Sequence, residues 1–220
     1  MMWPTHEPLG DHGVLVSYEN RIDLTVGQKV RLLAETLENN APPWLQEVVF
    51  SYRCILVLYD LHSIRYSGAL EFIKSNDVNT VPPDPLLPHL YQIPTVYGGQ
   101  NGPDLKHVAD ITGYTTEEVI ERFAATIFTI YFLGFLCAQP YLGGLPEELH
   151  VPRQASPRLH MPAGSVGIGG AQASLITIDQ PSGHNFIGRT SLSLYDPKTI
   201  PPTRLRAGDQ VVFPRISGRP

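Results

Sequence analysis

The sequence is poor in cysteine, tryptophan and charge, and these shortages exclude several classes of protein. Only two cysteines, Cys54 and Cys137, occur in 220 residues, which excludes a disulfide-rich scaffold. Both lie in apolar stretches, and we see no secretory signal at the N-terminus, so we expect two buried free thiols. Charged residues make up 17% of the chain and the formal net charge is −5, which argues against a general nucleic-acid binder.

Long apolar runs are also absent. The longest, residues 127–137, is about half the length that a membrane span needs. The histidines show no metal-ligand spacing, so we expect no metal site. These absences predict a cytoplasmic protein that binds neither nucleic acid nor membrane.

The first 80 residues alternate between strand and helix signals. Apolar and β-branched runs indicate strands, and apolar residues at helical spacing indicate amphipathic helices. Thr25 and Gln28 fit a capping box at the start of the first helix. The resulting βαββα order predicts a small α/β domain with its helices on one face of a sheet. The predicted strands span residues 13–18, 48–52 and 54–59, and the predicted helices span residues 25–39 and 66–74.

Proline marks the domain boundary. Four of the 21 prolines fall within residues 77–88, which is the composition of a semi-rigid linker. We place this linker at residues 81–90, between an N-terminal domain at 1–80 and a second domain at 91–220.

The second domain opens with a strand at residues 91–97 and then two helices. Asp104 begins the first helix at its positive dipole end, and Gly113 ends it. Thr115 caps the second helix in another capping box. From Phe128 to Phe213, short apolar runs alternate with glycine and proline turns, which is typical of a closed barrel or a sandwich. The fold class expected for the whole chain is therefore α+β.

Residues 152–170 concentrate polar groups on a backbone that proline and glycine constrain. Arg153 and Arg158 suit bidentate binding of a phosphate or carboxylate, and pairing with an acidic residue on a barrel loop is equally consistent. Ser165 suits a substrate hydrogen bond or a simple turn. Arg189 suits a ligand contact or an ion pair at a strand end.

Short motifs follow one another in a fixed order along nearly the whole chain. They are Gly10-Asp11, Val96–Gly99, Gly102–Leu105, Phe132–Phe135, Pro140–Gly143, Pro152–Gly170, Ile187–Thr190, Leu194–Pro197 and Leu205–Asp209. In this order they resemble the allophanate hydrolase subunit 1 family, which includes the B-type subunits of 5-oxoprolinase and the kinase inhibitor KipI.

The resemblance implies a small N-terminal α/β domain joined to a cyclophilin-like β-barrel of the carboxyltransferase type. It implies a heteromer with an allophanate hydrolase subunit 2 partner, which is the C-type subunit of 5-oxoprolinase, and with a third, A-type subunit. In the 5-oxoprolinase interpretation, this assembly opens the lactam of 5-oxoproline to glutamate. ATP with Mg²⁺ would then be shared with the partner subunits, and this chain alone would bind no cofactor tightly. Two alternatives are a non-catalytic protein, either a KipI-like inhibitor of a histidine kinase or a scaffold subunit, and a biotin-dependent carboxyltransferase subunit.

The same resemblance, joined to side-chain chemistry, selects candidate site residues. Arginines would stabilise phosphate charge, and a glutamine and a serine would orient the amide. We expect the catalytic groups to be Arg158, Gln172 and Ser165, the cofactor-binding residues Arg153, Arg189, Gly164 and Gly167, and the substrate-binding residues Tyr141 and His184.

Four short segments depart from the family pattern. Together these departures predict an altered substrate or lost catalysis, so whether the chain is an active enzyme stays open at this point. The family's His-Ser-Ser is Phe123-Ala124-Ala125, its Pro-Gly-Phe is Cys137-Ala138-Gln139, its Gln-Thr-Gly is Gln172-Ala173-Ser174, and its Pro-Gly-Gly-Trp is Pro181-Ser182-Gly183-His184.

Overall fold

The computed structural model describes residues 4–77 and 88–218, and the chain divides into two compact units, residues 1–87 and 88–220. Each unit has its own buried hydrophobic core. The predicted linker at 81–90 lies mostly outside the described residues. Within those residues, no helix is both long and apolar enough to cross a membrane.

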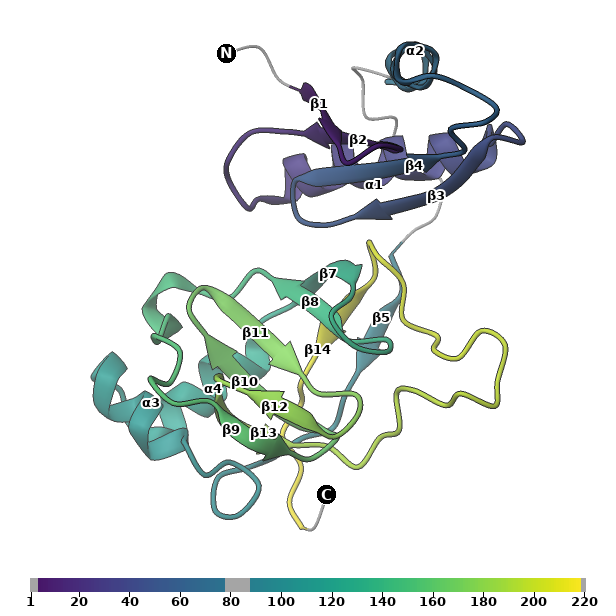
Figure 1. The fold of residues 1–220 in the computed structure, drawn as a ribbon. Helices are drawn as coiled ribbons and strands as arrows, with labels where there is room; N and C mark the ends of the chain where they lie inside the picture. The colour runs from purple at the N-terminus through teal and green to yellow at the C-terminus, as the bar shows by residue number, and fades with distance from the viewer. Residues whose placement is uncertain (1–3, 78–87, 219–220) are drawn as a thin grey trace. The chain divides into compact units, whose positions relative to one another are not determined.

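The first unit is a four-stranded antiparallel sheet with two helices (Figure 1). The sheet order is β1-β2-β4-β3. The sequence did not predict β1, because it is short and contains Pro8. It forms the edge of the sheet, which is where proline is tolerated in a strand. The elements are β1 (Thr5–Leu9), β2 (Gly13–Ser17), α1 (Leu24–Asn39), β3 (Leu45–Phe50), β4 (Cys54–Tyr59) and α2 (Tyr66–Asn76).

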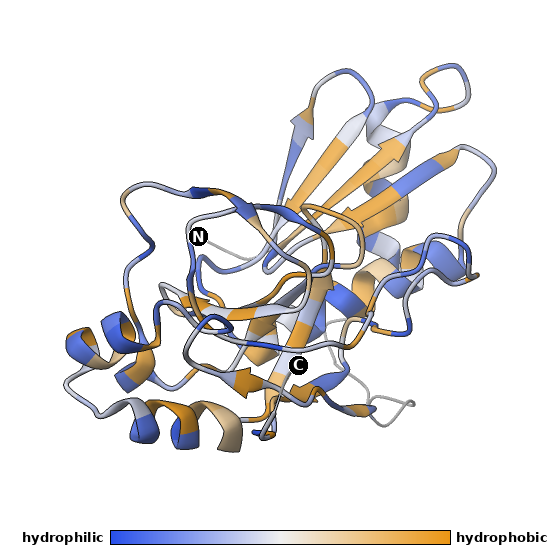
Figure 2. Cartoon of the chain, turned by 90° about the horizontal axis from the view of Figure 1, so that it is seen from below, coloured by the Kyte–Doolittle hydropathy of each residue, from blue (hydrophilic) through white to orange (hydrophobic). Residues whose placement is uncertain are grey.

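Buried and partly exposed side chains alternate along β2 and β4, and the buried ones form the core of this unit. Val14 and Val16 on β2, and Ile55 and Val57 on β4, are fully buried against the helices. The two helices contact each other and the sheet, so they cover the same face. Figure 2 shows the middle strands of this sheet as mainly hydrophobic, whereas the helices are hydrophobic on one side only.

The predicted cap of α1 was wrong. Asp23, not Thr25, is the N-cap residue, and its carboxylate accepts a hydrogen bond of 2.9 Å from the backbone N–H of Val26. Aspartate and threonine are both good N-caps, so the sequence alone does not choose between positions two residues apart.

The second unit is built on a strongly curled eight-stranded sheet, with the order β5-β14-β7-β8-β11-β10-β13-β6 (Figure 1). The α+β class is therefore confirmed, and the sheet forms a half-barrel. A separate two-stranded sheet pairs β9 (Arg158–Met161) with β12 (Gln180–Ser182). The eight strands are β5 (Leu90–Gln92), β6 (Val96–Tyr97), β7 (Phe128–Leu133), β8 (Pro140–Gly143), β10 (Ser165–Gly169), β11 (Gln172–Leu175), β13 (Asn185–Arg189) and β14 (Gln210–Val212).

One segment, residues 90–97, supplies both edges of this sheet. Its first part, β5, pairs in parallel with β14, and its second part, β6, pairs with β13 at the other edge. The predicted single strand is thus interrupted near Pro94, which has no N–H to continue a ladder. Because both edges belong to one short segment, the sheet must curl back on itself.

Two helices cover the core of the second unit. α3 (Leu105–Thr112) ends at Gly113, whose φ of 76° is left-handed, and α4 (Thr116–Ala125) begins with the capping box of Thr115 and Glu118; both predictions are confirmed. Phe123 on α4 packs against Phe128 and Phe213 at the centre of the core.

Two other expectations for this unit need correction. The described residues between β13 and β14 contain no strand, and this long segment projects from the sheet (Figure 1). Both cysteines are free, but Cys137 is exposed in the β7–β8 loop and Cys54 is half-buried. The apolar neighbours of Cys137 in the sequence therefore do not bury it.

Candidate functional site

A cavity of about 190 Å³ opens in the second unit where the β7–β8 loop meets strands β8, β11 and β12. This is small compared with the cavities that hold drug-sized molecules, so it suits a ligand of metabolite size. The lining residues are Phe135, Gln139, Pro140, Tyr141, Arg153, Gln172, Ala173, Ser174, Gln180, Pro181, Ser182, Gly183 and His184.

Three residues that line the cavity have a buried side-chain atom with no hydrogen-bond partner among the described residues. These atoms are Ser174 Oγ, Gln180 Oε1 and His184 Nδ1. Native proteins pair nearly all of their buried polar atoms, and leaving one unpaired costs about 1–3 kcal/mol. Three such atoms on residues that line one cavity make it the candidate binding site of this unit.

His184 is held in its neutral form. Burial, aided by the nearby positive charge of Arg153, lowers the pKa of His184 to about 4. The ring lies directly over Gly169, where an added Cβ would come within 2.4 Å of His184 Cδ2. Only glycine at position 169 leaves room for the ring. At neutral pH the cavity therefore contains an uncharged imidazole.

The mouth of the cavity carries a positive charge. Arg153 is exposed, and its guanidinium donates a hydrogen bond of 3.2 Å to Gln172 Oε1. The loop that carries Arg153 is fixed on both sides, since Asn185 Nδ2 donates to the Pro152 carbonyl at 2.9 Å and the Gln154 N–H donates to the Gly183 carbonyl at 2.8 Å. Arg153 is thus placed where it can meet an anionic group of a ligand.

The rim formed by the β7–β8 loop has an unusual backbone. Phe135 and Ala138 have φ values of 64° and 57°, a left-handed conformation that costs a non-glycine residue about 1–2 kcal/mol. Phe135 is 69% exposed although it lines the cavity. Strained backbone of this kind concentrates at ligand sites, where the surrounding structure maintains it.

Replacing Ala138 by glycine is expected to stabilise the second unit by about 1 kcal/mol, because glycine adopts a positive φ without a Cβ penalty. The measurement is the unfolding free energy from the denaturant midpoint. Ala124→Gly inside helix α4 is the matched control and should destabilise by about 1 kcal/mol. A loss of stability in Ala138→Gly would contradict the assignment of strain to this loop.

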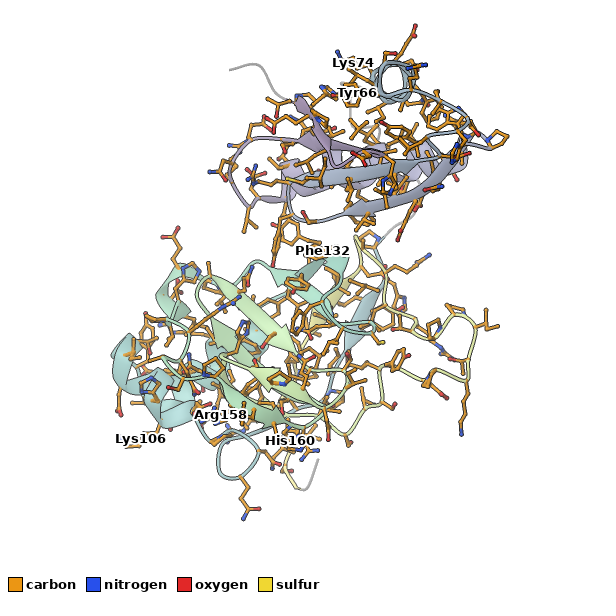
Figure 3. The ribbon with its side chains drawn as sticks, viewed as in Figure 1. Tyr66, Lys74, Lys106, Phe132, Arg158 and His160 are labelled. Carbon is orange, nitrogen blue, oxygen red and sulfur yellow. The ribbon has the colours of Figure 1, made fainter. Side chains whose placement is uncertain are left out.

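Arg158, predicted to be catalytic, does not line the cavity. Figure 3 labels Arg158 on the second unit. It forms a bidentate ion pair with Asp104, with nitrogen–oxygen distances of 2.7 and 2.5 Å, and Asp104 raises the pKa of its guanidinium. Asp104 also accepts a 2.7 Å hydrogen bond from the Phe186 N–H, and its side chain makes no capping bond to α3. Of the two alternatives that the sequence left open for Arg158, the structure shows the ion pair.

Four more predicted site residues lie on or next to β10 and β13, outside the cavity lining. Ser165 is buried and donates to the Pro162 carbonyl at 2.7 Å, and Arg189 Nε donates to the Ala163 carbonyl at 3.2 Å. Added Cβ atoms at Gly164 and Gly167 would come within 2.1 Å of Thr190 O and 2.5 Å of Asn185 O. The structure explains these residues by packing, and their ligand roles stay predictions.

Of the predicted site residues, the structure brings together Arg153, Gln172, Tyr141 and His184. The sequence did not point to Gln139, Ser174 or Gln180 as site residues. A signal for two of them was present, because Gln139, Ser174 and His184 lie in three of the four departures from the family pattern. The fourth departure, Phe123-Ala124-Ala125, lies in α4, where Phe123 belongs to the core.

The comparisons with known proteins agree with this architecture. The family described as carboxyltransferase domain, subdomain C and D, matches residues 4–205. The B-type subunit of 5-oxoprolinase from Bacillus subtilis (strain 168) is 36% identical over 229 residues, which cover 96% of this chain and 92% of that protein. The B-type subunit of 5-oxoprolinase from Escherichia coli O157:H7 is 51% identical over 122 residues, covering 56% of each chain.

A solved structure extends the comparison to the fold. The crystal structure of TTHA0988 superposes with a TM-score of 0.81 and 28% identity over 94% of this chain, which spans 40% of that longer chain. No group of three or more potential metal-ligating side chains is present among residues 4–77 and 88–218. With its near-complete match to the carboxyltransferase C and D subdomains and to the Bacillus protein, the chain belongs to the family of 5-oxoprolinase B-type subunits.

Proposed function

We propose that this chain is the B-type subunit of an ATP-dependent 5-oxoprolinase and that the cavity of its second unit binds the lactam. The observation that carries this proposal is the set of buried polar atoms on Ser174, Gln180 and His184 that find no partner within residues 4–77 and 88–218. Family membership supplies the class of substrate, and the cavity supplies a place of the right size and polarity for it.

The chemistry of 5-oxoproline matches the groups around the cavity. Its carboxylate is suited to Arg153 at the mouth, and its ring amide offers both a donor and an acceptor to the polar lining residues. Ser174 can donate its hydroxyl proton to the lactam carbonyl. These contacts would place and polarise the amide bond that opens to give glutamate.

His184 is suited to orienting the substrate and not to removing a proton. With a pKa of about 4, its imidazole is a weak base at neutral pH, and an efficient general base has a pKa near the working pH. Bound ATP with Mg²⁺ would supply phosphoryl transfer, which activates the lactam oxygen for ring opening by water with release of ADP and phosphate. We assign ATP to a site shared with partner subunits of the C type and the A type.

The test is reconstitution of this chain with its C-type and A-type partners, ATP and 5-oxoproline, with glutamate release as the readout. Arg153→Ala is expected to raise the KM for 5-oxoproline about 10- to 100-fold, because a charged hydrogen bond contributes about 1.5–3 kcal/mol. Arg122→Ala, which removes an exposed arginine paired with Glu148, is the control and should leave the KM unchanged.

A complete assembly that forms but releases no glutamate would overturn the enzymatic proposal. The non-catalytic alternative, a KipI-like protein or a scaffold, would then be the better account of the chain.

A further inference from the structure

We propose that the cavity selects its ligand by an amide N–H group, and that Gln180, positioned by Gln139, is the residue that recognises it. The proposal rests on the function proposed above for the identity of the ligand, and it assigns the specificity of that site to a named pair of side chains.

The orientation of the Gln180 amide is fixed by a buried hydrogen bond. Its Nε2 donates to Gln139 Oε1 at 2.6 Å, and the two residues are 4% and 9% exposed. A side-chain amide has one donating and one accepting end. One of its two Nε2–H groups is engaged with Gln139, and the accepting end, Oε1, is buried and has no partner in the described part of the chain.

Reversing the side-chain amide of Gln180 alone would be unfavourable. It would bring two carbonyl oxygens together in place of the 2.6 Å hydrogen bond, in surroundings where water does not compensate. The backbone of Gln139 is itself held by the β7–β8 loop, where its N–H donates to the Leu136 carbonyl and its carbonyl accepts from the Gly134 N–H. While Gln139 presents its own oxygen to Gln180, Gln180 Oε1 is an acceptor.

The other two unpaired atoms do not determine whether the ligand must donate or accept a hydrogen bond. The Ser174 hydroxyl rotates to donate or to accept, and the neutral His184 ring does either through a change of tautomer. Gln180 Oε1 is an acceptor only. A ligand that presents a hydrogen to it is bound, and one that presents a lone pair is rejected, because two buried acceptors would then face each other.

The decisive comparison is 5-oxoproline against its oxygen analogue, in which the ring N–H is replaced by an ester oxygen and the shape is kept. Sites built to hydrogen-bond a polar group reject analogues that lack it by large factors. In the reconstituted assembly we expect the inhibition constant of the lactone to exceed the KM of the lactam at least about 100-fold. An inhibition constant of the lactone equal to the KM of the lactam would overturn the proposal.

Gln139→Leu tests the positioning role. Without its partner, Gln180 can rotate and present Nε2, so the preference for lactam over lactone should fall to within about tenfold. Gln46→Leu, at an exposed position on β3 of the first unit, is the matched control and should keep the full preference. Unfolding curves of both variants establish that they fold. A folded Gln139→Leu protein that retains the full preference would overturn the proposal.

A second experiment separates this proposal from the proposed function, because it needs neither partners nor turnover. Binding of 2-pyrrolidone and γ-butyrolactone to the full chain is followed by the NMR signals of the Gln139 and Gln180 side-chain amides. Perturbation by the lactam alone supports the proposal, even if the assembly fails to hydrolyse 5-oxoproline. An equal response to both compounds, or to neither, would overturn it.

Discussion

Replacing Asp104 by alanine is expected to lower the unfolding free energy of the second unit by about 3 kcal/mol. The Asp104 side chain is 8% exposed, and it joins three elements, since it precedes α3, pairs with Arg158 on β9 and accepts from the Phe186 N–H of β13. Alanine would leave the buried Phe186 N–H without an acceptor, which is the costly loss, and it would leave the Arg158 guanidinium, whose side chain is 36% exposed, to be solvated in part by water.

Hydrogen exchange of β10 amides measures this effect, because both tryptophans, Trp3 and Trp44, lie in the first unit and do not report on the second. Asp110→Ala on the same helix is the control. Its ion pair with Lys106 is exposed on both sides, so its removal should cost less than about 0.5 kcal/mol. Equal losses of unfolding free energy in the two variants would show that the Asp104 ion pair stabilises the second unit no more than an exposed ion pair does.

Acid is expected to destabilise the second unit through His184. The folded protein holds the pKa of His184 at about 4, below its ordinary value of 6.5, because the buried ring resists protonation. As the pH falls from 6.5, the unfolded chain takes up a proton that the folded chain refuses. The unfolding free energy therefore decreases between pH 6.5 and about 4, by about 3 kcal/mol in total, at about 1.4 kcal/mol for each pKa unit.

The measurement is the unfolding free energy of wild type and of His184→Gln at pH 7.5 and at pH 4, again from the hydrogen exchange of β10 amides. The variant has no group to titrate at this position, so its loss of stability should be smaller than that of wild type by about 3 kcal/mol. The same pH dependence in wild type and His184→Gln would contradict the assignment.

Local signals in the sequence located most of the elements. Gly113 and the Thr115 capping box marked helix ends correctly, because these effects depend on residues within one turn. The β1 strand and the division of residues 90–97 between two sheet edges were not predictable in this way. Both depend on partners distant in the sequence, and local patterns do not encode those partners.

The sequence predicted the kinds of residue at the candidate site better than it predicted which individual residues belong to it. Arg153, Gln172, Tyr141 and His184 were selected from motifs, and the fold brings them to one cavity. Arg158 came from the same motif but pairs with Asp104 outside the cavity lining. Gln180 had no signal of its own, since an isolated glutamine in a polar stretch is ordinary on a surface.

By itself, the sequence determined the α+β class, the family and the positions at which the chain departs from the family pattern. Those properties follow from composition, local periodicity and motif order. Only the tertiary structure decided which arginine is neutralised by an ion pair and which polar side chains are buried without partners. Burial and pairing are properties of segments that meet across the fold, as residue 139 meets residue 180 and residue 104 meets residue 158.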